Sequence, residues 1–202
     1  MIDTDRITAM DAGETCAAVG LAYSQLVGAE ARQLYLAAHW AALHPGETLE
    51  EARCRSGRRT LPGRERAKHL GADGTPSVAE FAPAELGVLQ GMGHVAADNL
   101  VRDALNLQYR HPLLWEAVAA GVPRAWQARA VARMCAVAGL DREQARWVDA
   151  VTTPYAGALP WGASSLWWRP GSSRSIRGRP SSGVWLRRWS GSCGRGSPTS
   201  SV

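Results

Sequence analysis

The residues best suited to chemistry lie between Ala84 and Leu105, where a short helix, a glycine turn and a longer helix are expected to follow one another. This order is typical of a helix-turn-helix, with Gly91 in the turn. On the exposed face of the second helix, Asn99 offers an amide to base edges and Arg102 offers a guanidinium to bases or phosphates. The pattern therefore predicts Asn99 and Arg102 as candidate DNA-binding residues.

Two acids on the same helix argue against contact with DNA. Asp98 and Asp103 are expected on the exposed face as well, where their carboxylates would repel phosphates. A helical hairpin packed in a bundle explains the segment without any ligand. We favour this interpretation and keep a DNA-binding helix-turn-helix module as the alternative.

The chain lacks the common catalytic, cofactor-binding and metal-binding motifs. The chain has no GxxxxGK[ST] loop, no GxGxxG after a strand, no GxSxG elbow and no HExxH helix. Its five histidines are isolated, and Cys16, Cys54, Cys135 and Cys193 lack the spacing of a metal knuckle. We therefore expect no enzyme activity, no cofactor and no metal ligand.

Charge is distributed unevenly along the 202 residues, whose formal net charge is +5. Seven of the 23 basic residues and none of the 18 acidic residues lie in 163–202, so residues 1–162 carry a net charge of −2. The part of the chain that is expected to fold thus lacks the overall basic character of a DNA-binding domain. If DNA is a partner, binding is expected to be weak.

The N-terminus and the hydropathy pattern bear on localisation. There is no run of eighteen apolar residues, and no basic region precedes an apolar stretch at the start. We therefore expect a cytoplasmic protein without a membrane partner.

Apolar residues recur at a helical period through most of the chain, which predicts an all-α bundle. The predicted helices span 11–44, 84–90 and 94–107, and three more begin near Pro112, Pro123 and Asp141. In the first helix, the apolar residues that recur at close to a 3.6-residue period are Val19, Tyr23, Leu26, Leu34, Ala38 and Ala41. One tryptophan in each of four helices is expected in the core, namely Trp40, Trp115, Trp126 and Trp147. The Gly-, Pro-, Arg- and Glu-rich stretch 45–80 is predicted to be a variable surface loop.

Several blocks of sequence occur in an order that resembles a known family. They are EFAPAEL, GMGHVAADNLVRDALNL, HPLLWEAVAAGVPRAWQARAVA, WVDAV and LPWG. In this order they resemble the actinobacterial domain of unknown function that precedes HNH endonuclease modules, also called the thirteen-E-twelve repeat family, over roughly residues 15–162. The resemblance implies that DNA cleavage in the family belongs to a C-terminal HNH module, which this chain lacks. It therefore implies that residues 11–162 are a truncated, non-catalytic, nuclease-associated domain, a remnant of a mobile or repeated element. A helical protein-interaction domain is a third hypothesis.

The composition changes abruptly at 163–202, which holds twelve serines, seven arginines, six glycines and four tryptophans. A basic tail that binds nucleic acid is one interpretation. We favour the other, in which a frameshift near the codon for Ala163 has replaced amphipathic helical sequence by an out-of-frame reading. It predicts a disordered tail. Loss of the following helices is also expected to expose apolar surface and to favour self-association.

Overall fold

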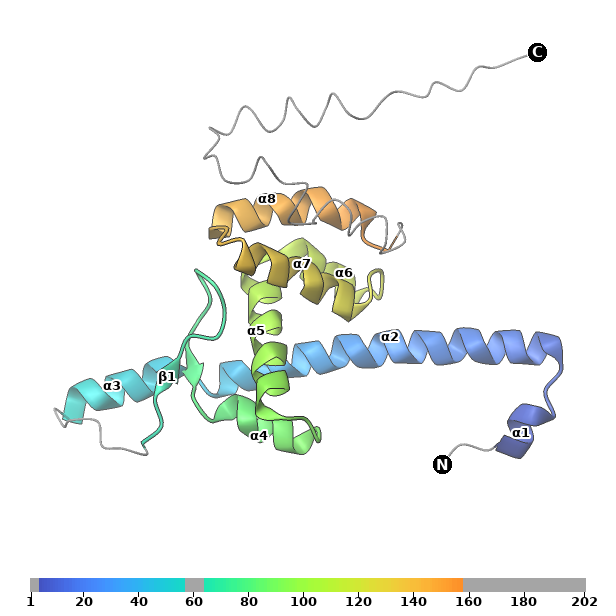
Figure 1. Cartoon of the computed structure of the whole chain (residues 1–202), viewed down its shortest axis with the longest axis horizontal. Coiled ribbons are helices and arrows are strands. Elements are labelled where there is room, and N and C mark those ends of the chain that lie inside the picture. Colours follow the sequence, from blue (N-terminus) through green and yellow to red (C-terminus); the bar gives the residue numbers. More distant parts are fainter. Residues whose placement is uncertain (1–3, 57–63, 158–202) are drawn as a thin grey trace, which may run out of the picture. The chain divides into compact units, whose positions relative to one another are not determined.

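The computed structural model describes residues 4–56 and 64–157, and most of them are helical (Figure 1). In chain order the helices are α1 (Thr4–Thr8), α2 (Ala12–Leu43), α3 (Gly46–Ser56), α4 (Ala82–Leu89), α5 (His94–Arg110), α6 (Pro112–Ala119), α7 (Ala125–Val137) and α8 (Arg142–Thr152). A 3₁₀ turn, η1 (Thr153–Tyr155), follows α8. Strands β1 (Ala67–Lys68) and β2 (Val78–Ala79) pair antiparallel, with Ala67 opposite Ala79. The prediction of an all-α bundle is confirmed.

Local signals in the sequence fix the ends of several helices. The Asp11 carboxylate accepts a hydrogen bond from the Glu14 backbone N–H at 2.8 Å, and the Glu14 carboxylate accepts one from the Asp11 N–H at 3.0 Å. This reciprocal capping box satisfies N–H groups that have no partner inside the helix. Asp141 and Gln144 form the same arrangement at the start of α8. The predicted helix starts at Asp11 and Asp141 are therefore confirmed.

The core is built around α5, which contacts α2, α4, α6, α7 and α8 (Figure 1). From Leu100 to Leu107 every residue of α5 except Arg102 is buried. Helix α4 can approach α5 closely because Gly87 lacks a side chain, since a Cβ there would lie 3.0 Å from the Ala97 Cβ. Gly91, with φ +64°, makes the turn between the two helices. Helices α4 and α5 thus form the predicted helix-turn-helix-like pair.

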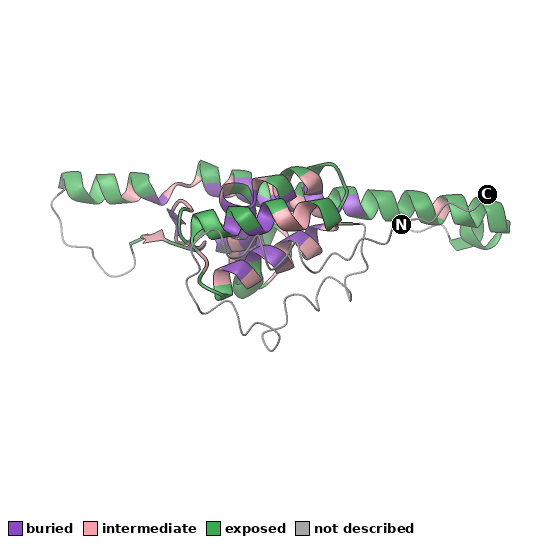
Figure 2. Cartoon of the chain, turned by 90° about the horizontal axis from the view of Figure 1, so that it is seen from above, coloured by how far each residue is buried: buried purple, intermediate pink, exposed green. Residues whose placement is uncertain are grey.

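The two halves of α2 differ in burial. Its buried residues begin at Val27 and end at Ala41, because the bundle helices cover only the C-terminal half. Val19, Tyr23 and Leu26 remain 63%, 55% and 47% exposed, and Figure 2 shows this half of α2 as largely exposed. Of the six residues that carry the apolar period of this helix, Leu34, Ala38 and Ala41 are therefore the ones that lie in the core.

The stretch 45–80 is more ordered than the predicted loop. Helix α3 occupies its beginning, and β1 and β2 occupy its end. The helix sequence GETLEEARCRS is rich in good helix formers but has no apolar stripe, so a search for hydrophobic periodicity misses it. The prediction of a loop across the whole stretch is wrong. Residues 57–63 lie outside the described residues.

Of the four tryptophans expected in the core, two make defined contacts inside the fold and two remain partly exposed. The Trp40 Nε1–H donates to the Ala82 carbonyl at 2.8 Å, and the Trp115 ring stacks on Tyr35 with 3.9 Å between centroids. Trp126 and Trp147 each remain 41% exposed, so the prediction of core packing is wrong for these two. LPWG, the predicted boundary at 162 and the tail 163–202 lie outside the described residues. Within the part of the chain that is described, no helix is long and apolar enough to cross a membrane.

Candidate nucleic-acid interface on α5 and α7

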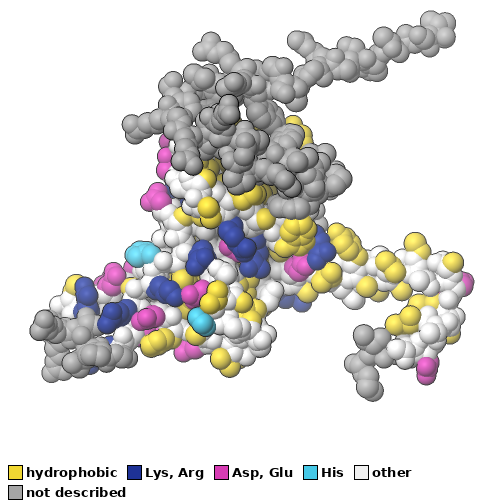
Figure 3. Space-filling view, viewed as in Figure 1, with side chains coloured by type: hydrophobic (Ala, Val, Ile, Leu, Met, Phe, Trp, Pro, Cys, Tyr) yellow, Lys and Arg dark blue, Asp and Glu magenta, His cyan; other side chains and the backbone are white. Residues whose placement is uncertain are grey.

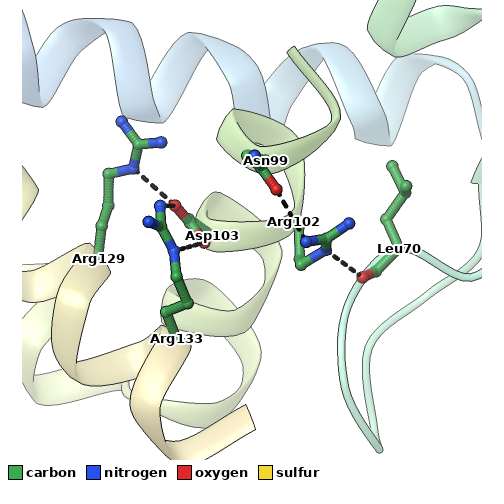
Figure 4. A network of polar contacts seen from close by, with 6 residues as sticks. All are labelled: Leu70, Asn99, Arg102, Asp103, Arg129 and Arg133. Atoms are coloured by element: carbon green, nitrogen blue, oxygen red, sulfur yellow. Dashed lines mark hydrogen bonds and ion pairs between the residues drawn. The ribbon is translucent and has the colours of Figure 1, made fainter. Parts of the chain in front are cut away.

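The two residues predicted to bind DNA contact each other. Arg102 Nη1 donates to the Asn99 side-chain oxygen at 2.8 Å, and Arg102 Nε donates to the Leu70 carbonyl at 3.1 Å (Figure 4). Leu70 belongs to the loop between β1 and β2, so Arg102 joins that loop to α5. Both side chains are half-buried. Part of their hydrogen-bonding capacity is therefore used inside the fold.

The two acids that the sequence places on an exposed face have different surroundings. The Asp98 carboxylate forms an ion pair with Lys68, with 2.7 Å between Nζ and Oδ2. The Asp103 side chain is only 1% exposed, so its predicted exposure is wrong. Asp103 is buried because α7 packs on α5 at this point and brings two arginines to its carboxylate.

Arg129 and Arg133 share the carboxylate of Asp103 (Figure 4). Arg129 Nε lies 2.8 Å from Oδ2, and Arg133 donates from Nη2 to Oδ2 at 2.5 Å and from Nε to Oδ1 at 3.4 Å. The hydrogen bond to Asp103 raises the pKa of Arg133. The arginine side chains remain 25% and 50% exposed, so the cluster reaches the surface, where Figure 3 shows Lys and Arg side chains gathered over α5 and α7.

The burial of α5 limits how it could enter a DNA groove. His94 and Val95 are exposed at its first turn, whereas Leu100 to Leu107 are enclosed apart from Arg102. Recognition helices contact bases mainly through their N-terminal residues. Only the first two turns of α5 are therefore open for such a contact.

A second group of titratable residues, which sequence reasoning did not predict, is buried inside the bundle and is called the interior cluster. Arg110, His111 and Asp149 are 0%, 0% and 1% exposed. The Asp149 carboxylate accepts from the backbone N–H groups of Leu113 and Leu114, at 2.8 and 2.9 Å, and so caps the first turn of α6. The partners of Asp149 lie 36 and 35 residues away, so no local pattern in the sequence could have revealed this cap.

Burial shifts the pKa values of two residues in this interior cluster. Desolvation, with the nearby charge of Arg110, lowers the pKa of His111 to about 4. Desolvation also raises the pKa of Asp149, against hydrogen bonds that lower it. Arg110 Nη2 donates to the carbonyls of Leu140 and Asp141 in the turn between α7 and α8. The cluster therefore joins α5, the start of α6 and that turn.

Neither cluster has the composition of a metal centre. Among residues 4–56 and 64–157, no three His, Cys, Asp or Glu side chains come together in a way that could hold a metal ion. Comparison of the chain with family models, curated proteins and solved structures gives no match.

Proposed function

We propose that this chain is a non-catalytic helical domain of the kind that precedes HNH endonuclease modules. The observation that carries the proposal is where the resembling blocks lie in the fold. Four of the five blocks lie on α4, α5, α6 to α7, and α8, and these helices pack around α5. The blocks therefore correspond to one structural unit, as expected for the segments that define a domain.

The proposal includes a broken reading frame after this unit. In-frame sequence beyond Trp161 would supply further amphipathic helices and then the HNH module, whose histidines and asparagine would carry the chemistry. The domain itself would contribute no catalytic group. Its role would be to support or position the nuclease of an intact relative.

The test is the nucleotide sequence from the codon for Trp161 through the region downstream of the stop codon. We expect that a single insertion or deletion near the codon for Ala163, once corrected, restores helical sequence followed by an HNH module. The corrected protein should nick or cut duplex DNA in the presence of a divalent metal ion, and the present chain should not. The proposal would be contradicted by a gene without an insertion or deletion, in which the other reading frames contain stop codons.

DNA binding by the helix-turn-helix-like pair is the second candidate function. It is favoured by Asn99 and Arg102 lying together near the open end of α5. Substitution Asn99→Ala in the full chain should weaken binding to a cognate duplex by about fivefold or more, as for loss of a base contact. Gln108→Ala, at an exposed position on the same helix, is the matched control. Equal effects of the two substitutions would argue against base reading by Asn99.

A protein-interaction domain is the third candidate, favoured by the exposed residues Val19, Tyr23 and Leu26 of α2. Association through this face should persist at high salt, because apolar contacts are not screened. Sedimentation analysis of the full chain and of a Val19→Ser/Leu26→Ser variant would test it. Association that is unchanged by the substitutions would exclude this face.

A further inference from the structure

We propose that Arg129 and Arg133, which pair with the buried Asp103, and Arg102, which precedes Asp103 on α5, form a surface that binds the phosphodiester backbone of duplex DNA. This inference deepens the second candidate function, but it does not require α5 to enter a groove. The four residues are called the Asp103 surface below.

The Asp103 surface carries an excess of positive charge. Arg129 and Arg133 share one carboxylate, which leaves one positive charge uncompensated. Arg102 donates only to neutral acceptors, the Leu70 carbonyl and the Asn99 amide oxygen. The Asp103 surface therefore carries a net charge of +2, although residues 1–162 as a whole are slightly acidic.

Asp98 lies on α5 itself, and Glu30 lies on α2, which packs against α5. Asp98 is paired with Lys68, and Glu30 is paired with Arg124 through two hydrogen bonds. Each of these acids is thus matched by a base of its own. The positive charge of the Asp103 surface is not offset by either of them.

The three arginines keep hydrogen-bond donors that are not used inside the fold. A guanidinium has about five N–H groups, and each of the three arginines uses only one or two of them in the bonds to Asp103, Asn99 and Leu70. The Arg133 side chain is half exposed and that of Arg129 a quarter exposed. Donors are therefore left to contact a ligand at the surface.

Asp103 fixes the geometry of the two α7 arginines. It lies on the central helix, and its carboxylate holds both arginines in place before any ligand binds, which reduces the entropy lost on binding. Arg129 and Arg133 are four residues apart on α7, so they lie on one face of the helix. Their guanidinium groups meet at the same carboxylate, and planar guanidinium groups suit phosphate oxygens.

The experiment measures binding of the full chain to a labelled duplex of mixed sequence, about two helical turns long, by fluorescence anisotropy between about 50 and 200 mM salt. Arg133→Gln removes the most exposed arginine and leaves Asp103 paired with Arg129, so the fold should persist. We expect binding to weaken about fivefold, and the slope of log Kd against log salt to fall by about one.

Two further variants make the test specific to this surface. Asp103→Asn keeps a hydrogen-bond acceptor and removes the negative charge, so binding should tighten about threefold at low salt. The controls are Arg146→Gln and Glu143→Gln, which change the charge by the same amounts at exposed positions on α8. We expect each control to alter Kd by less than about twofold. Thermal melting of every variant reports whether it is folded.

The outcomes separate this inference from the functions proposed above. If Arg133→Gln and Arg146→Gln weaken binding equally, only the net charge matters and the Asp103 surface is refuted, while Asn99 remains open to its own test. If the full chain does not bind the duplex at low salt, the inference and the second candidate function both fall. If a poly-glutamate peptide displaces the duplex at equal charge concentration, the assignment to phosphodiesters is overturned. The nuclease-associated proposal depends on none of these results.

Discussion

The Asp103 surface and the interior cluster of Arg110, His111 and Asp149 differ in their exposure to solvent. At Asp103 the carboxylate is buried, but the arginines that bind it are 25% and 50% exposed. In the interior cluster, Arg110, His111 and Asp149 are all enclosed. Charged groups that are buried away from water need hydrogen-bond partners inside the fold, and removing one partner leaves a buried hydrogen-bonding group unsatisfied. We therefore expect the interior cluster to determine stability, and the Asp103 surface to influence binding more than stability.

The largest expected effect is that of Asp149→Ala. It leaves the N–H groups of Leu113 and Leu114 without their carboxylate partner at a helix start that is only partly open to solvent. The free energy of unfolding, measured by urea denaturation, should fall by about 4 kcal/mol. Asp141→Ala, which removes the exposed cap of α8, should cost only about 1 kcal/mol. Similar losses in the two variants would abolish the distinction between buried and exposed caps.

The next effect is a pH dependence caused by His111. Its pKa is about 4 in the folded chain, against an ordinary 6.5, so between these values the unfolded chain binds a proton that the folded chain does not. The free energy of unfolding should therefore fall as the pH decreases from 6.5 to 4, by up to about 3 kcal/mol. Asp149, whose pKa is raised, acts in the opposite sense at the acidic end of this range.

Denaturation at several pH values would measure this effect, with a His111→Phe variant to remove it. His39→Gln, at an exposed position on α2, is the control and should keep the full pH dependence. If stability changes equally with pH in the His111→Phe variant, another group is responsible.

A smaller effect is expected for Asp103→Asn. The substitution weakens the bonds from Arg129 and Arg133, but both guanidinium groups can reach water because they are partly exposed. We expect a loss of about 2 kcal/mol in urea denaturation, less than for Asp149→Ala. A loss as large as that of Asp149→Ala would show that Asp103 belongs with the interior cluster in its energetics.

The smallest effect on stability is expected for Arg133→Gln. Its side chain is half exposed, so solvent screens its interaction with Asp103. The free energy of unfolding should change by no more than about 0.5 kcal/mol, even though DNA binding weakens. A large loss of stability would place the role of Arg133 in folding rather than in binding.

Helix positions could be predicted from the sequence because their signals are local. The capping acids Asp11 and Asp141, and the prolines at 45 and 112, act within a few residues of the helix ends that they set. A regular apolar period then identifies the helices between them. Helix α3 lacks that period, and its helix-forming composition was the only signal that could have revealed it.

Burial could not be predicted equally well, because it depends on residues far away in the chain. Asp103 follows the polar pattern of an exposed position, yet its partners lie 26 and 30 residues further on. Val19 and Tyr23 follow the apolar pattern of a core position, yet no residue of α2 before Val27 is buried. A helical period tells which residues share a face, but it does not tell which length of that face is covered.

The central position of α5 also bears on the order in which the protein can form during synthesis. Chains leave the ribosome from the N-terminus, so α2 and α4 emerge before α5, whereas α6, α7 and α8 emerge after it. The arginines that neutralise Asp103 and the acid that caps α6 are thus made late. Until residue 149 is available, α5 presents apolar side chains without their partners. While this last third of the domain is translated, the nascent chain therefore exposes the apolar side of α5 that α6, α7 and α8 later cover.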